Sequence, residues 1–296
     1  MRQALLGVRA TALNAAISPM IEMGAYEALW LEDGATQKRV ADLFRARPHA
    51  LPSELVSREA AMRAAERVLD IYREHGIERF GIRVHRAGDY PLRLRDARHP
   101  VEVLQYQGLW ELTESRGVSI VGTRKPTADG KKRAQRLASL LVAENFTVVS
   151  GLAAGIDRVA HETAIKAGRP TIAVIGTPLS SAYPAENKQL QAYIASECLV
   201  ISEVPVGKYY SHDWRFNRGW FPQRNATMSA LTEATVIVEA SETSGTLTQA
   251  RAALYQGRKL FILNSCFERP DITWPRRFAE LGAVRVRRME DILEAL

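Results

Sequence analysis

The sequence predicts an α/β protein: a Rossmann-like, doubly wound, mostly parallel sheet preceded by a small helical domain. Two observations point to this fold. From residue 118 onward, short β-rich runs such as "VSIVG", "FTVVSG" and "TIAVIG" alternate with longer helical stretches. These runs are almost wholly apolar, which is typical of parallel strands that helices cover on both faces.

The chain before residue 86 has a helical pattern. Apolar residues recur three and four positions apart in 4–17, 35–44 and 55–76, and the last stretch ends at a glycine. We therefore expect a helical accessory domain over residues 1–85. The pattern fades over residues 86–117, where two prolines interrupt any helix, so an extended connector is expected there.

The Rossmann-like domain is expected over residues 118–296. Strands are expected at 118–122, 146–151, 171–176, 198–202, 235–240 and 259–263, helices at 128–145, 156–168, 185–196, 225–234 and 246–257, and a final strand and helix within 284–296.

Composition limits the function. The chain has 296 residues, 46% of them hydrophobic, which is enough for a large core and two domains. We expect a cytoplasmic protein without a membrane partner, because the sequence has neither a membrane-spanning apolar run nor a secretory signal. Cys198 and Cys266 lack metal-site spacing, so no metal or cofactor is expected. The net charge of +7 favours a polyanionic partner.

Ligands of doubly wound sheets bind beyond the carboxyl ends of the strands. Gly151 and Gly155 flank the turn after the second strand, where they would let a phosphate approach the backbone at a helix N-terminus. The alternative is a plain strand-to-helix reversal. Arg124, directly after the first strand, is predicted to grip the phosphate, unless it is a solvated surface residue.

Other residues at the strand ends complete the predicted phosphate site. Ser244, Gly245 and Thr246 begin a helix and could hold a second phosphate, although Ser241 or Thr243 could simply cap that helix. The remaining members of the predicted site are Gly122, Lys125, Ser150, Arg224 and Asn225.

Three acids also follow strands and are the candidates for catalysis. Asp157, Glu203 and Glu239 would converge at one edge of the sheet. Neighbouring buried carboxylates often act as the general acid and general base of an enzyme. Asp157 is equally explained as a first-turn acid that meets the helix dipole. His161 is at helical spacing from Asp157 and is interpreted as a packing residue rather than a catalytic one.

Residues 208–225, "KYYSHDWRFNRGWFPQRN", mix aromatic and basic side chains. Such mixtures stack bases and contact phosphates in sites for single-stranded nucleic acid. Tyr183, Trp214 and Trp220 are the predicted base-stacking residues. The alternative is that these rings fold under the loop and form a small core of their own.

These motifs together resemble the DprA/Smf family of DNA-processing proteins. The resemblance covers roughly residues 88–265, through "SIVGTRKPTADG", "VVSGLAAGIDRVAHETAIKAG", "YPAEN", "FPQRN" and "SGTLTQARAALYQGR" in the family's order. It implies an extended Rossmann domain that grips single-stranded DNA, dimerisation, and loading of the RecA recombinase. Arg124 matches the family's DNA-gripping arginine. The family's Gly-rich signature is matched by Ser150, Gly151, Gly155 and Asp157, and its Arg-Asn pair by Arg224 and Asn225.

The chain departs from the family pattern at the pocket. Ala226 stands where the family commonly has arginine, "GTPLSS" replaces a Gly-Gly turn, and Asn264 and Ser265 replace Pro-Gly. No segment resembling the family's winged helix precedes Leu296. These departures argue against a recombinase partner and suggest a different role on DNA.

Three functions follow as hypotheses, and one of them, a nucleotide-sensing domain, explains residues 208–225 poorly. The first is a DNA-binding protein that grips single strands or an extruded nucleotide at the sheet edge. The second is a DNA glycosylase that cleaves an N-glycosidic bond in the same pocket, since the resemblance extends to a superfamily containing LOG-type phosphoribohydrolases. Defence against phage DNA with modified bases would fit the second.

Overall fold

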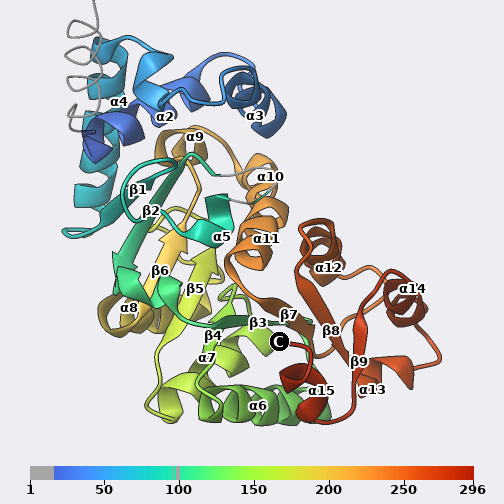
Figure 1. The fold of residues 1–296 in the computed structure, drawn as a ribbon. Helices are drawn as coiled ribbons and strands as arrows, with labels where there is room; N and C mark the ends of the chain where they lie inside the picture. Colours follow the sequence, from blue (N-terminus) through green and yellow to red (C-terminus); the bar gives the residue numbers. More distant parts are fainter. Residues whose placement is uncertain (1–16, 96, 98–100) are drawn as a thin grey trace, which may run out of the picture.

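The computed structural model describes residues 17–95, 97 and 101–296. Apart from Ile17, the helix expected over residues 4–17 lies outside them. The described chain forms a central sheet with helices on both faces and a helical region at one end (Figure 1). This confirms the predicted fold class.

The strands pair in an order that is typical of a doubly wound sheet. They are β1 (Gly81–Val84), β2 (Val103–Gly108), β3 (Gly117–Val121), β4 (Thr147–Ser150), β5 (Thr171–Ile175), β6 (Leu199–Ser202), β7 (Ala234–Ile237), β8 (Lys259–Leu263) and β9 (Val284–Val286). Their order across the sheet is β1-β2-β6-β5-β4-β3-β7-β8-β9. The β1–β2 and β2–β6 pairs are antiparallel, and the other neighbours are parallel.

Residues 86–117 are not the extended connector that the sequence suggested. They hold β2 and the short helix α5 (Leu92–Arg95), and β1, from the range expected to be helical, pairs with β2. Gly81 lies opposite Tyr106, whose ring occupies the space that a side chain at position 81 would need. The sheet therefore extends beyond β6 by two antiparallel strands.

The helices cover the sheet and form the region at its end. They are α2 (Pro19–Leu31), α3 (Gln37–Ala46), α4 (Arg58–Glu74), α6 (Ala128–Ala143), α7 (Ile156–Lys166), α8 (Lys188–Glu197), α9 (Val206–Tyr210), α10 (Trp214–Asn217), α11 (Trp220–Leu231), α12 (Thr246–Tyr255), α13 (Asn264–Phe267), α14 (Trp274–Glu280) and α15 (Glu290–Leu293), with short 3₁₀ turns at Pro52–Glu54, Trp110–Glu114 and Ala185–Asn187. The sequence pattern did not predict α2.

Side chains of each central strand alternate between two hydrophobic cores. Ile120 of β3 packs with α6 and α7, whereas Val121 faces the core that includes α11 and α12. All residues of β3, β4 and β5 are buried. This two-sided burial explains why the strands read as continuous apolar runs.

The strand order reverses between β3 and β7. Strands β4, β5 and β6 continue from β3 in one direction, whereas β8 and β9 continue from β7 in the other. Ligands of doubly wound proteins bind beside the carboxyl ends of the strands at such a reversal. The loops after β3, β4 and β7 therefore hold the candidate site.

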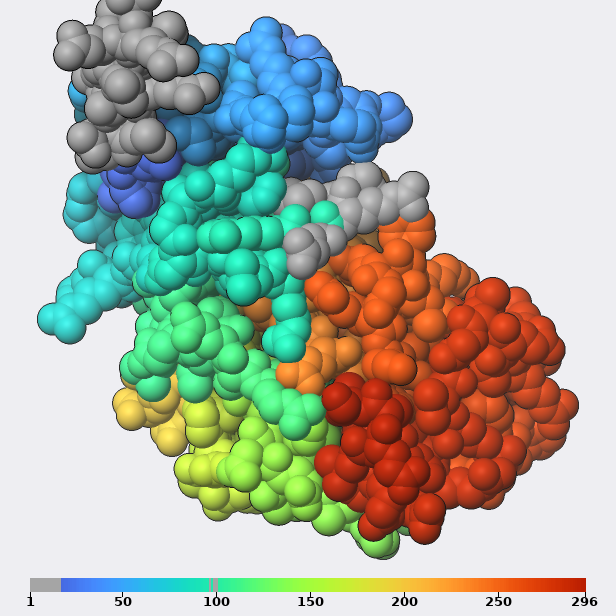
Figure 2. All heavy atoms as spheres, viewed as in Figure 1, coloured from blue at the N-terminus to red at the C-terminus, as the bar shows by residue number. Residues whose placement is uncertain are grey.

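The N-terminal helices lie directly against the rest of the described chain (Figure 2) and share a core with the Rossmann-like part. Glu27 of α2 is buried, and its carboxylate accepts hydrogen bonds from the backbone N–H groups of Val206 (2.7 Å) and Gly207 (2.9 Å) at the start of α9. The ring of Trp30 lies 4.9 Å from that of Trp220 in α11. A single hydrophobic cluster contains both tryptophans.

Candidate nucleic-acid interface

The loops that follow β3, β4 and β7 are bonded to one another. Thr123 N–H donates to the carbonyl of Glu239 (2.7 Å), and Ile156 N–H donates to the carbonyl of Thr123 (3.2 Å). A Cβ at Gly122 would lie 2.6 Å from the Ile156 side chain and 2.8 Å from the Glu239 carbonyl oxygen. Gly122 is therefore needed for close packing of the three loops.

The predicted phosphate cradle after β4 holds a carboxylate of the protein itself. Asp157 is buried and accepts hydrogen bonds from Gly151 N–H (3.1 Å) and Ala153 N–H (3.4 Å). Burial raises the pKa of Asp157, while attraction to Arg224 and the two N–H groups oppose the rise. Asp157 thus stabilises the loop. The catalytic role predicted for it, and the open cradle predicted at Gly151, do not fit these contacts.

Gly155 has a conformational role in the same loop. Its φ angle is +81°, and a Cβ there would lie 2.7 Å from the carbonyl of Arg124. Only glycine satisfies both conditions without strain. Gly155 therefore lets the start of α7 approach the loop that carries Arg124.

Arg224 is a structural residue rather than a ligand-facing one. It is only 4% exposed, and its guanidinium donates to the carbonyls of Gly151 and Val174, the latter at 2.7 Å. Its Nε donates to Asn225 Oδ1 (2.9 Å), and the Asn225 amide reaches the carbonyl of Gly245 (3.4 Å). The prediction of direct DNA contact by the Arg224 side chain was wrong, because its donors join β4, β5 and α11.

Two further polar residues, Ser150 of β4 and His161 of α7, are fully buried. The Ser150 hydroxyl donates to the carbonyl of Ile120 (2.6 Å), so this side chain does not reach a phosphate as predicted. His161 Nδ1 lies 2.8 Å from the Thr171 hydroxyl, and burial lowers the pKa of His161 to about 3. The packing interpretation of His161 is consistent with this environment.

Arg124 and Lys125 are exposed after β3, as their predicted roles require. The guanidinium carbon of Arg124 lies 5.7 Å from the ring centroids of both Tyr183 and Phe221, within the range of cation–π contact. A phosphate can still bind at the edges of this group, because the five N–H donors of a guanidinium lie in its plane and point away from its faces.

The ring of Tyr183 belongs to an aromatic platform, which we define as Tyr183, Trp214 and Phe221. The centroid of Tyr183 lies 4.8 Å from that of Trp214 and 5.3 Å from that of Phe221. Trp214 is 48% exposed. At the end of β5, a Cβ on Gly176 would lie 2.7 Å from the Phe221 ring, so glycine makes room for the platform.

Trp220 was predicted to stack on a base, and this is wrong. It is 2% exposed and packs against Trp30 of α2. Phe221 takes its place in the platform, although it was not among the predicted stacking residues. The only local signal for Phe221 was its membership of the aromatic and basic segment.

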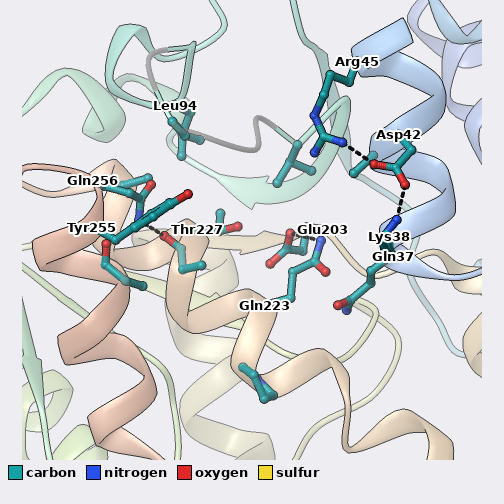
Figure 3. Close-up of a pocket in the computed structure, with 17 residues that line it drawn as sticks. Gln37, Lys38, Asp42, Arg45, Leu94, Glu203, Gln223, Thr227, Tyr255 and Gln256 are labelled. Atoms are coloured by element: carbon teal, nitrogen blue, oxygen red, sulfur yellow. Dashed lines mark hydrogen bonds and ion pairs between the residues drawn. The ribbon is translucent and has the colours of Figure 1, made fainter.

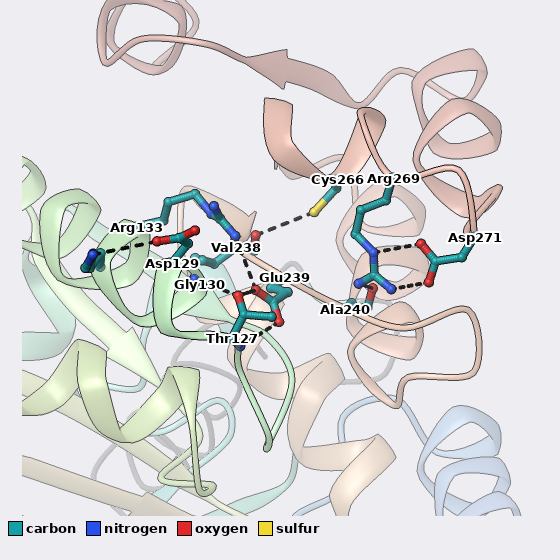
Figure 4. Close-up of polar contacts among 11 residues, drawn as sticks. Thr127, Asp129, Gly130, Arg133, Val238, Glu239, Ala240, Cys266, Arg269 and Asp271 are labelled. Atoms are coloured by element: carbon teal, nitrogen blue, oxygen red, sulfur yellow. Dashed lines mark hydrogen bonds and ion pairs between the residues drawn. The ribbon is translucent and has the colours of Figure 1, made fainter.

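Glu239 stabilises the start of α6 (Figure 4). Its carboxylate accepts hydrogen bonds from the N–H (3.0 Å) and hydroxyl (2.7 Å) of Thr127 and pairs with Arg133 (3.3 Å). The Thr127 hydroxyl in turn accepts a hydrogen bond from Gly130 N–H (2.9 Å). These contacts assign Glu239 to helix capping rather than to the predicted catalytic role.

Glu203 has a different environment from the other two acids. Its carboxylate accepts a hydrogen bond from Gln223 Nε2 (3.2 Å) and faces a cavity between α3, α11 and α12 (Figure 3). Burial raises the pKa of Glu203 to about 7, and the nearby side chains of Thr227 and Gln223 offset only part of this effect. The three acids thus have separate partners, so they do not form the shared catalytic group that was predicted.

The loop before α12 is organised by its own hydroxyl groups. Ser244 Oγ donates to Thr246 Oγ1 (3.0 Å) and accepts from Thr246 N–H (3.2 Å), and the Thr246 hydroxyl reaches the carbonyl of Gly122 (3.2 Å). Gly245 is exposed beside them. Among these three residues, Gly245 is the most accessible for the predicted phosphate contact.

The side chains that commonly bind metals are scattered over the part of the chain that the structure describes. In that part, no group of three or more histidine, cysteine, aspartate or glutamate side chains is arranged to hold a metal ion. No helix within the same residues is long and apolar enough to cross a bilayer.

Comparisons with known proteins agree with this architecture. The family model described as DNA recombination-mediator protein A matches residues 81–296. "DNA processing protein DprA" of Bacillus subtilis is 36% identical over 231 residues, which cover 78% of this chain and 75% of that protein. "Protein Smf" of Synechocystis is 42% identical over 179 residues, 59% of this chain and 44% of that protein.

Solved structures give the same relationship. The X-ray structure of DNA processing protein A from Streptococcus pneumoniae has a TM-score of 0.72 and 25% identity, and the match covers 94% of this chain and 98% of that one. DNA processing protein A from Helicobacter pylori, whose structure is described for its single-stranded DNA binding mode, has a TM-score of 0.60 and 26% identity over 73% of this chain and 95% of that one. The chain belongs to the DNA recombination-mediator protein A family, also called DprA/Smf.

Proposed function

We propose that this protein binds single-stranded DNA at the carboxyl edge of its sheet, with Arg124 and Lys125 at the phosphates and the aromatic platform at the bases. The observation that carries the proposal is the position of the exposed Arg124 guanidinium, 5.7 Å from two rings of that platform. Sites for single-stranded nucleic acid combine cationic groups with stacking rings in this way.

The relatives and the charge of the chain support the proposal. Single-stranded DNA binding is reported for the Helicobacter pylori relative. The net charge of +7 favours association with a polyanion through release of counterions. The buried polar residues Arg224 and Asp157 then serve to hold the loops from which the exposed groups project.

The glycosylase hypothesis gains no comparable support. Cleavage of an N-glycosidic bond needs a carboxyl group that can reach the sugar. Glu239 caps α6, Asp157 bonds the loop after β4, and Glu203 faces a cavity bordered by a different side of α11. We therefore propose binding without base removal.

Binding of a labelled single-stranded oligonucleotide, followed by fluorescence anisotropy over a range of salt concentrations, tests the proposal. We expect tighter binding to the single strand than to its duplex. Arg124→Ala should weaken binding and reduce the salt slope by about one, because one phosphate contact is lost. Arg169→Ala is the matched control, since Arg169 is exposed before the amino end of β5.

Two results would contradict this assignment. An unchanged salt slope in Arg124→Ala would remove Arg124 from the phosphate contacts. Equal losses in Arg124→Ala and Arg169→Ala would mean that general positive charge, rather than this edge of the sheet, attracts the DNA.

The proposal includes a homodimer in the cytoplasm, which the family resemblance supports. Light scattering of the purified protein, with and without oligonucleotide, measures the oligomeric state. A recombinase partner is not part of the proposal, because the sequence departs from the family pattern at Ala226, Asn264 and Ser265.

A further inference from the structure

The segment 206–221 belongs to the Rossmann-like part but lies against the N-terminal helices. It comprises α9, α10 and the first residues of α11, and it carries Trp214 and Phe221 of the aromatic platform. Helix α9 contacts both α2 and α4 (Figure 1). The N-terminal helices are therefore in a position to affect the DNA surface proposed above.

Glu27 of α2 anchors the start of α9. Its Oε1 accepts a hydrogen bond from Val206 N–H (2.7 Å), and its Oε2 accepts one from Gly207 N–H (2.9 Å). All three residues are buried. The first N–H groups of a helix have no acceptor within that helix, so buried ones need an acceptor from elsewhere. The two bonds fix both the position and the direction of α9.

Asn217 connects α9 to Trp214. It is buried at the end of α10, and its side-chain amide donates to the carbonyls of Tyr209 in α9 (2.9 Å) and His212 (3.2 Å). Trp214 begins the same short helix and lies beside Tyr183, with 4.8 Å between the ring centroids. A displacement of α9 would therefore move Trp214 relative to Tyr183.

Two further contacts hold the segment against the N-terminal helices. Trp30 of α2 packs on Trp220 in the first turn of α11. The hydroxyl of Tyr210, at the end of α9, lies 3.2 Å from Nε2 of His75 at the end of α4, and both of these side chains are exposed. Of the three contacts, only that of Glu27 is both polar and buried.

We infer that Glu27 is a positioning residue for DNA binding, because its carboxylate holds α9 where Trp214 meets Tyr183. The inference rests on the proposed binding of single-stranded DNA by the aromatic platform. Glu27 is buried and acts through the backbone of α9 rather than by contact with DNA. In Glu27→Gln, an amide offers one acceptor oxygen and turns N–H donors toward the second backbone N–H. We expect this variant to release the start of α9.

Fluorescence anisotropy with a labelled single-stranded oligonucleotide tests this inference. Burial raises the pKa of Glu27 to about 7, so the pH is set about one unit above that value, where the carboxylate is ionised. Glu27→Gln should weaken binding by about fivefold, the lower end of the range for a lost stacking contact.

Glu22→Gln is the matched control. Glu22 is a buried acid on the same helix, and it accepts hydrogen bonds from the N–H (2.9 Å) and the hydroxyl (2.6 Å) of Ser53. Both partners of that contact lie within the N-terminal part. Glu22→Gln should therefore bind DNA as tightly as the wild type.

Two more variants separate positioning from a general loss of stability. If Glu27 acts through Trp214, the variant with both Glu27→Gln and Trp214→Ala should bind no more weakly than Trp214→Ala alone, because an absent ring cannot be displaced. Gly207→Ala disturbs the same contact from the other side, since its Cβ would lie 3.3 Å from Glu27 Oε2. It should also weaken binding, and it replaces Glu27→Gln if that variant does not fold.

The inference is overturned if Glu27→Gln folds and binds DNA as tightly as the wild type, or, where it does not fold, if Gly207→Ala does so. It is also overturned if Glu22→Gln loses as much affinity as Glu27→Gln, or if the losses of Glu27→Gln and Trp214→Ala add. If Trp214→Ala itself binds like the wild type, the platform of the proposed function fails too. A weakened Trp214→Ala beside an unaffected Glu27→Gln removes only the role of Glu27.

Discussion

Trp214 and Trp220 belong to one aromatic and basic segment, but they have opposite environments. Trp214 is 48% exposed beside Tyr183, whereas Trp220 is 2% exposed against Trp30. Their sequence surroundings are alike, so composition alone assigned both to base stacking. The partner that buries Trp220 comes from α2, a helix distant in sequence.

These tryptophans give a matched pair of substitutions. Trp214→Ala should reduce the affinity for single-stranded DNA by about 1–3 kcal/mol through loss of stacking, with little change in stability. Trp220→Ala should lower the free energy of unfolding by about 3–5 kcal/mol through a core cavity. Anisotropy and urea denaturation measure the two effects. The platform assignment fails if Trp214→Ala binds DNA as tightly as the wild type.

Glu203 also predicts a dependence of stability on pH. Folding raises the pKa of Glu203 from 4.5 to about 7. The contribution of Glu203 to the free energy of unfolding is therefore fully present below pH 4.5 and is lost as the pH rises through about 7. Glu203→Gln removes this loss. The stability of the variant relative to the wild type should therefore increase over this window, by on the order of 3 kcal/mol.

Urea denaturation at several pH values measures that difference. Burial raises the pKa of Glu27 to about 7 as well. Glu27 therefore lowers the free energy of unfolding of both proteins by the same amount over this pH range and cancels in the comparison. A constant difference between variant and wild type across the window would show that Glu203 does not titrate there.

At the scale of the elements, the start of α6 depends on a side chain from the loop after β7. Glu239 bonds the N–H and hydroxyl of Thr127 and pairs with Arg133. Glu239→Ala should lower the free energy of unfolding by about 0.5–2 kcal/mol, because the partly buried donors at the start of α6 lose their acceptor. Urea denaturation should show a much smaller effect for Glu162→Ala, which breaks the more exposed ion pair with Arg158. Equal effects would contradict the capping role.

The sequence predicted the helices and strands that show a clear hydrophobic pattern within their own residues. The strands from β3 to β7 are buried on both faces, and only the middle of β8 is buried. These strands appear as apolar runs in the sequence, and α4 and α6 show clear helical spacing. β1 and β2 were missed because neither is a continuous apolar run: β1 contains Arg83, and β2 contains Gln105 and Gln107. Both strands also gain stability from pairing, which sequence periodicity does not report. The helix α2 was missed because it is apolar around most of its surface, including the buried Met23 and Trp30.

The candidate site was only partly predictable for a similar reason. The positions of Arg124 and Lys125 could be predicted because these residues follow closely on the apolar run that forms β3. The environments of Arg224 and Asp157 depend on loops that meet only in the folded chain, where these residues bond Gly151 instead of a ligand. Sequence reasoning placed these residues at the carboxyl edge of the sheet but did not separate the exposed side chains from the buried ones that support the loops.

At the scale of the whole molecule, the helical N-terminal part and the sheet share one core. Glu27 bonds the start of α9, and Trp30 packs on Trp220. We expect the described parts to unfold in one transition. Trp30→Ala should shift that transition by about 3–5 kcal/mol without splitting it. Far-ultraviolet circular dichroism and tryptophan fluorescence should give coincident curves. Two separate midpoints would show that the N-terminal helices unfold independently.

The anchoring of the loop after β4 also bears on how fast a partner can associate. Two side chains hold Gly151 in place. Asp157 accepts a hydrogen bond from the Gly151 N–H, and Arg224 donates one to the Gly151 carbonyl. A loop immobilised in this way needs no rearrangement at the encounter. We expect the loss of conformational entropy to fall on the flexible polynucleotide, and association with the proposed DNA partner to involve no slow isomerisation of this loop.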